Sequence, residues 1–104
     1  MGKATGIIEV FGLATAFVAV DAGCKAANVT VENLDKNKPG NADALPVPLI
    51  VAIKFRGSVA DVTAAVEAAE QAARAHAGVV SKHIIPNTEA STEKMLKINA
   101  FDKN

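Results

Sequence analysis

The chain has 104 residues, and its eleven basic and eleven acidic side chains give a formal net charge of zero. This length predicts one small domain over residues 1–104, with a core thin enough that self-association would add useful burial. A neutral chain with four Phe and no Trp or Tyr lacks the basic surface and the aromatic platform of nucleic-acid-binding proteins, and its charge does not favour an anionic membrane. Half of the residues are hydrophobic, but 21 of them are alanine, which favours slim elements that pack closely.

The first half of the chain predicts a strand, a helix and a second strand. The β-branched and aromatic run Gly6–Phe11 is typical of a strand. A helix is expected over Leu13–Ala27, and a second strand over Val29–Glu32. The bulkier apolar residues of the helix recur at helical spacing and form one stripe: Leu13, Phe17, Val20 and Cys24.

The second half opens with the clearest loop in the chain. Residues 33–48, from Asn33 to Pro48, hold three of the four prolines together with Asn, Asp, Lys and Gly. A third strand is expected over Leu49–Phe55, and a helix capped by Ser58 then continues to Gly78. The last two elements are a strand over Val79–Ile85 and a short helix over Ser91–Leu96.

The resulting order is strand, helix, strand, strand, helix, strand, helix. It predicts an α+β fold of the split βαβ (ferredoxin-like) type, in which two main helices pack on a four-stranded sheet and a short helix ends the chain.

The sequence offers no convincing catalytic group. His76 and His83 fall on different predicted elements, Glu9 is an isolated carboxylate that we expect to be solvated or hydrogen-bonded, and Cys24 is expected to be a small core residue. A single cysteine excludes an internal disulfide and a multi-cysteine metal site, and indicates a reduced, intracellular chain. No glycine-rich phosphate motif occurs. We therefore expect no catalytic residues, no metal and no cofactor, and we do not expect an enzyme.

Several strings, in order, resemble the hexamer-forming shell proteins of bacterial microcompartments. They are Gly6-Ile7-Ile8-Glu9, Gly12-Leu13, Asp21-Ala22, Lys25-Ala26-Ala27-Asn28-Val29, Arg56-Gly57-Ser58-Val59 and Val80-Ser81-Lys82-His83-Ile84-Ile85-Pro86. The resemblance covers about residues 6 to 98. It implies the BMC-domain fold and a homo-hexamer shaped as a flat tile, which meets other shell proteins edge to edge around encapsulated enzymes in the bacterial cytoplasm. The implied function is structural, with passage of small metabolites through a central pore.

The resemblance also implies which residues lie at the tile edge. By position these are Lys25, with Asn28 nearby, and Asn87, which stands where the family usually has an arginine inserted between tiles. The loss of that arginine implies weaker edge packing or a need for other shell components. A lysine in the last turn of a helix can donate to backbone carbonyls of a neighbour. The alternative is a solvated Lys25 paired with Asp21.

The pore-lining stretch implied by the resemblance is Lys36-Asn37-Lys38-Pro39-Gly40, followed by an insertion over Asn41–Pro48. Six copies of Lys36 and Lys38 around an axis would favour anions. Because a ring of like charges is costly when unhydrated, we expect at least one lysine to point into solvent or to pair with Asp35 or Asp43. The loop has no cysteine, so a loop-held metal cluster is not expected.

A second hypothesis from a different class remains open. The same fold type and the long loop are compatible with a small-molecule-binding regulatory domain that forms a trimer and closes its loop over an effector. The number of subunits and ligand-induced thermal stabilisation would separate the two hypotheses.

Overall fold

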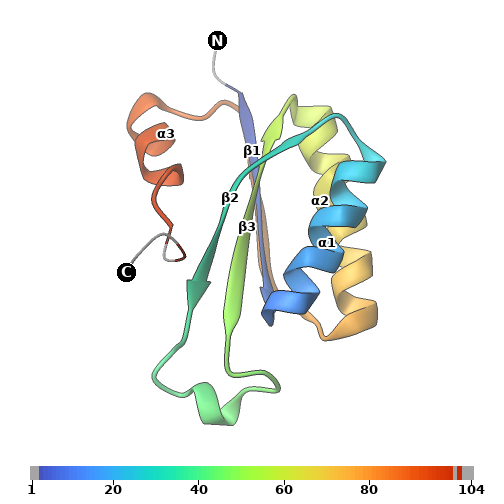
Figure 1. Ribbon diagram of the computed structural model, residues 1–104. Helices are drawn as coiled ribbons and strands as arrows, with labels where there is room; N and C mark the ends of the chain where they lie inside the picture. Colours follow the sequence, from blue (N-terminus) through green and yellow to red (C-terminus); the bar gives the residue numbers. More distant parts are fainter. Residues whose placement is uncertain (1–2, 100, 102–104) are drawn as a thin grey trace.

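The computed structural model describes residues 3–99 and 101; residues 1–2, 100 and 102–104 of the predicted domain lie outside the described residues. The elements are β1 (Ala4–Phe11), α1 (Leu13–Ala26), β2 (Thr30–Asn37), the 3-10 helix η1 (Ala42–Ala44), β3 (Ile50–Gly57), α2 (Val59–His76), β4 (Val79–Ile85) and α3 (Ala90–Leu96). The strands form one antiparallel sheet in the order β2-β3-β1-β4. Helices α1 and α2 lie on one face and α3 on the other (Figure 1). The predicted α+β fold is confirmed.

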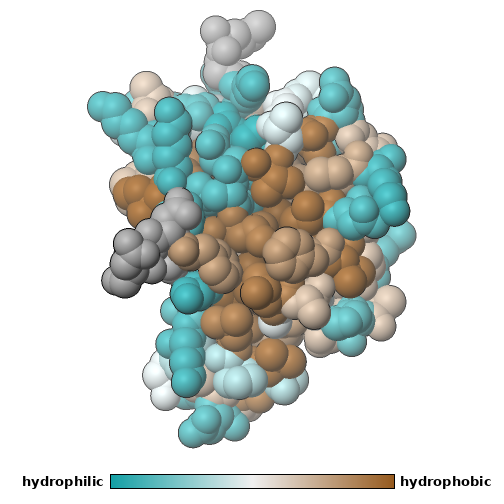
Figure 2. All heavy atoms as spheres, viewed as in Figure 1, coloured by the Kyte–Doolittle hydropathy of each residue, from teal (hydrophilic) through white to brown (hydrophobic). Residues whose placement is uncertain are grey.

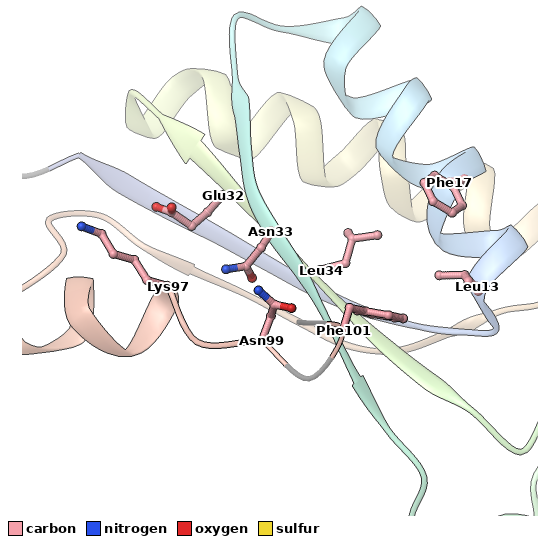
Figure 3. A pocket seen from close by; sticks show the side chains of 8 residues that line it. All are labelled: Leu13, Phe17, Glu32, Asn33, Leu34, Lys97, Asn99 and Phe101. Atoms are coloured by element: carbon pink, nitrogen blue, oxygen red, sulfur yellow. The ribbon is translucent and has the colours of Figure 1, made fainter. Parts of the chain in front are cut away.

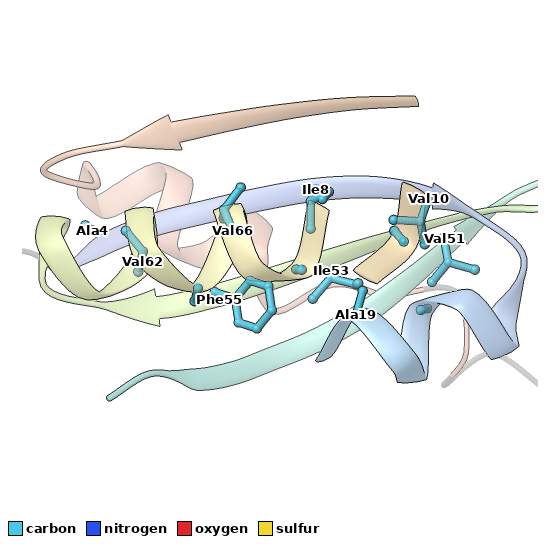
Figure 4. Close-up of a cluster of buried hydrophobic side chains, with 13 residues drawn as sticks. Ala4, Ile8, Val10, Ala19, Val51, Ile53, Phe55, Val62 and Val66 are labelled. Atoms are coloured by element: carbon cyan, nitrogen blue, oxygen red, sulfur yellow. The ribbon is translucent and has the colours of Figure 1, made fainter. Parts of the chain in front are cut away.

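The core lies between the sheet and the two long helices (Figure 4). Alternate residues of a strand point to opposite faces, so one set from β1 and one from β3 face the helices. Helix α2 is capped as predicted, because the Ser58 hydroxyl accepts a hydrogen bond from the Asp61 backbone amide at 3.0 Å. The buried core cluster is Ala4, Ile8, Val10, Ala16, Ala19, Val51, Ile53, Phe55, Val62, Ala65, Val66, Ala69 and Ala73.

Helix α1 faces the core with its small residues, and the prediction that Cys24 is a core residue is wrong. Ala16, Ala19 and Gly23 are buried on the inner side of α1, whereas Cys24 is exposed. A Cβ atom on Gly23 would lie only 2.6 Å from Cζ of Phe55. The close approach of α1 therefore requires the small residues. Of the bulkier stripe, Val20 packs against the core, whereas Leu13, Phe17 and Cys24 are exposed.

Strand β2 is longer than predicted, so the loop begins later than Asn33. Its last four residues pair in order with β3, from Leu34 opposite Ile53 to Asn37 opposite Ile50. Polar residues suit this position because β2 is an outer strand of the sheet. The predicted loop over residues 33–48 is corrected to one that starts at Lys38 and contains η1.

Helix α3 is attached to the sheet by two buried cations of β3. The Lys54 ammonium donates hydrogen bonds to the carbonyls of Leu96, at 3.0 Å, and Ile98, at 2.7 Å. Arg56 donates through two guanidinium nitrogens to the Glu93 carboxylate, at 2.7 and 2.5 Å. Burial lowers the pKa of Lys54, and the hydrogen bonds from Arg56 lower the pKa of Glu93. The C-terminal helix is thus held mainly by charge-assisted bonds.

Candidate functional site

The predicted edge and loop residues lie at opposite ends of the sheet. At one end, β2 begins and β3 ends, with Thr30 opposite Arg56; at the other, Asn37 lies opposite Ile50. Seven residue steps of about 3.3 Å separate the two ends of each strand, which is about 23 Å. In Figure 1 the last turn of α1 is accordingly far from η1.

Lys25 occupies the last turn of α1, with its side chain 76% exposed. Its Nζ lies 2.8 Å from Oδ2 of Asp21, one helical turn earlier. The hydrogen bond with Asp21 raises the pKa of Lys25. The protomer therefore contains the ion pair anticipated as the alternative role for this lysine. An exposed pair of this kind contributes little to stability, so Lys25 can exchange Asp21 for another partner.

Asn28 and Asn87 share a surface cleft of about 720 Å³. Asn28 follows α1, and Asn87 follows Pro86 just after β4, so the antiparallel sheet brings the two asparagines to the same end. Lys25 does not line this cleft. The lining residues are Lys3, Ala4, Asn28, Thr30, Arg56, Gly57, Ser58, Val59, Asp61, Pro86 and Asn87.

The predicted pore residues divide between a strand and a turn. Lys36 and Asn37 are the last residues of β2, whereas Lys38, Pro39 and Gly40 belong to the connection that follows. That connection is ordered by its own backbone hydrogen bonds, from the Ala42 amide to the Pro39 carbonyl at 3.0 Å and from the Leu45 amide to the Ala42 carbonyl at 3.1 Å. A short, internally bonded turn therefore projects beyond the ends of β2 and β3.

Lys36 and Lys38 have different surroundings although both are exposed. The Lys36 ammonium lies 5.1 Å from the centroid of the Phe101 ring, within the range of a cation–π interaction. Lys38 makes no ion pair with any described residue. Lys38 is thus exposed in the protomer, and the pore-lining roles of both lysines stay predictions.

An apolar surface that the sequence reasoning did not identify lies between these two ends. We call it the lateral apolar face and define it by Leu13, Phe17, Leu34 and Phe101. These residues line a cleft of about 530 Å³ between α1, β2 and the C-terminal segment (Figure 3). Phe17 is 60% exposed, and Figure 2 shows apolar atoms gathered over this part of the surface. The bulky stripe of α1 was the available signal, but the sequence analysis gave a location only to Cys24, which it placed in the core.

The candidate catalytic side chains stay apart. His76 lies at the end of α2, with Nδ1 2.8 Å from the Thr15 hydroxyl, and His83 is exposed on β4. Glu9 accepts a hydrogen bond from the Ser81 hydroxyl at 2.5 Å, so the expected hydrogen-bonded role is confirmed. Within residues 3–99 and 101, no three His, Cys, Asp or Glu side chains form a group that could hold a metal ion.

None of the described helices is both long and apolar enough to span a bilayer.

Comparison with known proteins gives consistent matches. Residues 4–88 match the BMC domain family. The chain is 35% identical over 94 residues to the bacterial microcompartment shell protein PduA of Citrobacter freundii, which covers 90% of this chain and 91% of that protein. It is also 35% identical over 100 residues to the carboxysome shell protein CcmK2 of Synechococcus elongatus, covering 94% and 89% of the two chains.

A solved structure shares the fold. It is a microcompartment protein from Desulfitobacterium hafniense DCB, with a TM-score of 0.71 and 27% identity. The match covers 96% of this chain and 49% of the other, so the chain spans about half the length of that protein.

Proposed function

The chain belongs to the BMC-domain family, and from that premise we propose that six copies close into a cyclic tile in the shell of a bacterial microcompartment. Its role is structural, as a shell protein and not as an enzyme. The regulatory trimer that the sequence left open is not favoured by the relatives, which are themselves shell proteins.

The observation that carries the hexamer is the exposure of the lateral apolar face. Phe17 is 60% and Leu13 38% exposed on α1, and a group of exposed large apolar residues marks a surface that is covered in the assembled state. Strands β2 and β4 are the two outer strands of the sheet, and the β4 side also exposes Val80. Contact between the β2 side of one protomer and the β4 side of the next is a heterologous (head-to-tail) contact. Such a contact forms a closed ring when the rotations between successive protomers add up to one full turn.

The shape of the protomer suits a flat tile. It measures 42 × 30 × 20 Å, and its loop and edge residues lie at opposite ends of the strands. If the strands run outward from the sixfold axis, the six loops meet at the centre while Lys25, Asn28 and Asn87 reach the perimeter. The thin, alanine-rich core gives a further reason for association, because burial between protomers adds to stability.

The central passage is lined, in this proposal, by Lys38, Pro39 and Gly40, with Lys36 and Asn37 at the base of the loop. Exposed lysines repeated around an axis favour small anionic metabolites over cations. Because η1 and its hydrogen bonds order the loop, the opening has a defined shape.

The perimeter would bind other shell proteins, and the closed shell would enclose enzymes. Lys25 is free to exchange its exposed partner Asp21 for backbone carbonyls of an adjoining tile. Asn28 and Asn87 present amides in one cleft, and these amides can donate and accept hydrogen bonds across a tile boundary.

Charge reversal at the perimeter tests this arrangement. Lys25→Asp should leave the hexamer intact but abolish two-dimensional sheets in electron micrographs, because it places two acidic groups, Asp21 and the new carboxylate, at the boundary. Arg74→Asp is the matched control, since Arg74 is 61% exposed in the last turn of α2 and pairs with Glu70 one helical turn earlier, at the other end of the strands from Lys25. Sheets formed equally by both variants would show that Lys25 is not an edge contact.

A further inference from the structure

The C-terminal aromatic residue Phe101 connects the lateral apolar face to the base of the loop. Its ring helps to line the cleft that also contains Leu13, Phe17 and Leu34, and it is 37% exposed. In Figure 3 the Phe101 side chain lies beside Leu34 of β2, across from the two residues of α1. The ring therefore has apolar neighbours on the flank of the protomer and not in the loop.

Lys36 follows Leu34 at the two-residue spacing that brings side chains to the same face of a strand. Its ammonium lies 5.1 Å from the centroid of the Phe101 ring, inside the limit of about 6 Å for an effective cation–π contact. Its backbone amide also donates to Oδ1 of Asp35 at 2.9 Å. The contact that fixes the Lys36 side chain to another segment is therefore the one at its ammonium.

Lys38 differs in each of these respects. It lies in the turn beyond β2, its side chain is exposed, and its ammonium makes no ring contact or ion pair with a described residue. Of the two lysines next to the loop, Lys36 contacts the Phe101 ring on the flank of the protomer, and Lys38 faces the solvent.

We propose that Phe101 is a positioning residue, which holds the Lys36 ammonium on the flank of the protomer so that Lys38 supplies the ring of cations at the mouth of the passage. The inference rests on the proposed hexamer for its functional consequence, but not for the contact itself. Release of the Lys36 ammonium from the Phe101 aromatic ring would add a second cation per protomer near the sixfold axis. The C-terminal segment therefore sets how strongly the passage attracts anions.

Carbon-13 NMR of reductively dimethylated lysines tests the contact in the full-length chain. Dimethylation keeps the positive charge and gives one signal environment per lysine, and Lys36→Arg and Lys38→Arg identify the two signals. The ring current of Phe101 should shift the Lys36 signal upfield of the Lys38 signal. Phe101→Leu should remove this shift, whereas Phe101→Tyr should retain it. A Lys36 signal that is the same in all three proteins would overturn the proposal.

Titration of the same samples with sodium sulfate, at low ionic strength, tests the consequence. Inorganic sulfate should move the Lys38 signal but not the Lys36 signal in the unmodified sequence, and should move both in Phe101→Leu. Movement of both signals before any substitution would contradict the positioning role.

Light scattering on these samples separates the two proposals. If the chain does not form hexamers, the hexameric pore fails, yet the ring-current shift still decides whether Phe101 holds Lys36. If hexamers form but the shift is absent, the positioning role fails alone.

Discussion

Gly23 determines how closely α1 approaches the sheet. With hydrogen as its side chain, the helix lies against the Phe55 ring, where a Cβ atom would be 2.6 Å from Cζ and 3.1 Å from the Ala65 carbonyl oxygen. Neither neighbour can move easily to make room for a methyl group, because Phe55 is fully buried and the carbonyl belongs to the backbone of α2. A single hydrogen atom therefore sets the position of the surface that α1 carries.

We predict that Gly23→Ala destabilises the chain. Overpacking destabilises a core by about 1–3 kcal/mol, and the better helix propensity of alanine offsets at most about 1 kcal/mol of this. The free energy of unfolding should therefore fall by about 1–2 kcal/mol. Gly40→Ala is the matched control, because no atom lies within 4 Å of its added Cβ, and its effect should stay below about 1 kcal/mol. Chemical denaturation of both variants measures the difference; equal stability would show that the helix can shift without cost.

The element that depends most on polar contacts is α3. Leu96 is the one buried residue of α3. The hydrogen bonds that attach α3 to the sheet run from Lys54 to the carbonyls of Leu96 and Ile98, and from Arg56 to Glu93. Because these cations are buried on the sheet, loss of the Glu93 charge leaves Arg56 with the Glu32 carboxylate and the Ala4 carbonyl as its remaining described partners, and less of its desolvation is offset. The docking of α3 should therefore depend on the ionisation of Glu93.

Acid should weaken the attachment of α3. The pKa of Glu93 is lowered in the folded chain by its hydrogen bonds with Arg56, so its contribution to stability is present above the unfolded pKa of about 4.3 and is lost as the pH falls through the lower folded value. Glu93→Gln should therefore lower the denaturation midpoint at pH 7 but have a smaller effect near pH 3. Glu67→Gln, at an exposed position on α2, serves as the control. A Glu93→Gln effect that does not diminish in acid would contradict this linkage.

Periodicity predicted the elements better than it predicted their orientation. The stripe on α1 was visible from its spacing, but spacing cannot tell which side of a helix meets the sheet when the adjoining side consists of the small residues Ala16, Ala19 and Gly23. The sequence likewise predicted β2 to end at Glu32, because the polar residues after it are typical of a loop. Pairing with β3 extends the strand to Asn37, and pairing is a tertiary effect that a local pattern does not contain.

At the scale of the whole molecule, the site residues predicted from the family resemblance fall into two groups separated along the strands. Residue order alone could not show this separation, since Asn28 and Asn87 are distant in sequence and meet only through the antiparallel sheet. Nor could it show the lateral apolar face, whose members come from α1, β2 and the C-terminal segment. The relative positions of the three surfaces are a property of the folded chain.

Phe17→Glu should break the ring of protomers while leaving each protomer folded. A carboxylate at a position that is 60% exposed costs the isolated protomer little, but its burial against a neighbour without a partner is unfavourable. Met95→Glu is the matched control, because Met95 is 65% exposed on α3, across the sheet from α1. Sedimentation velocity should show slower species for Phe17→Glu only; the same loss of assembly in both variants would argue against the lateral apolar face as the contact.

The mass of the assembled particle in solution tests the central claim most directly. Multi-angle light scattering of the unmodified chain should give six times 10.7 kDa, about 64 kDa, as a single species that does not dissociate on moderate dilution. A stable monomer of 10.7 kDa, or a trimer of half the predicted mass, would contradict the hexameric tile.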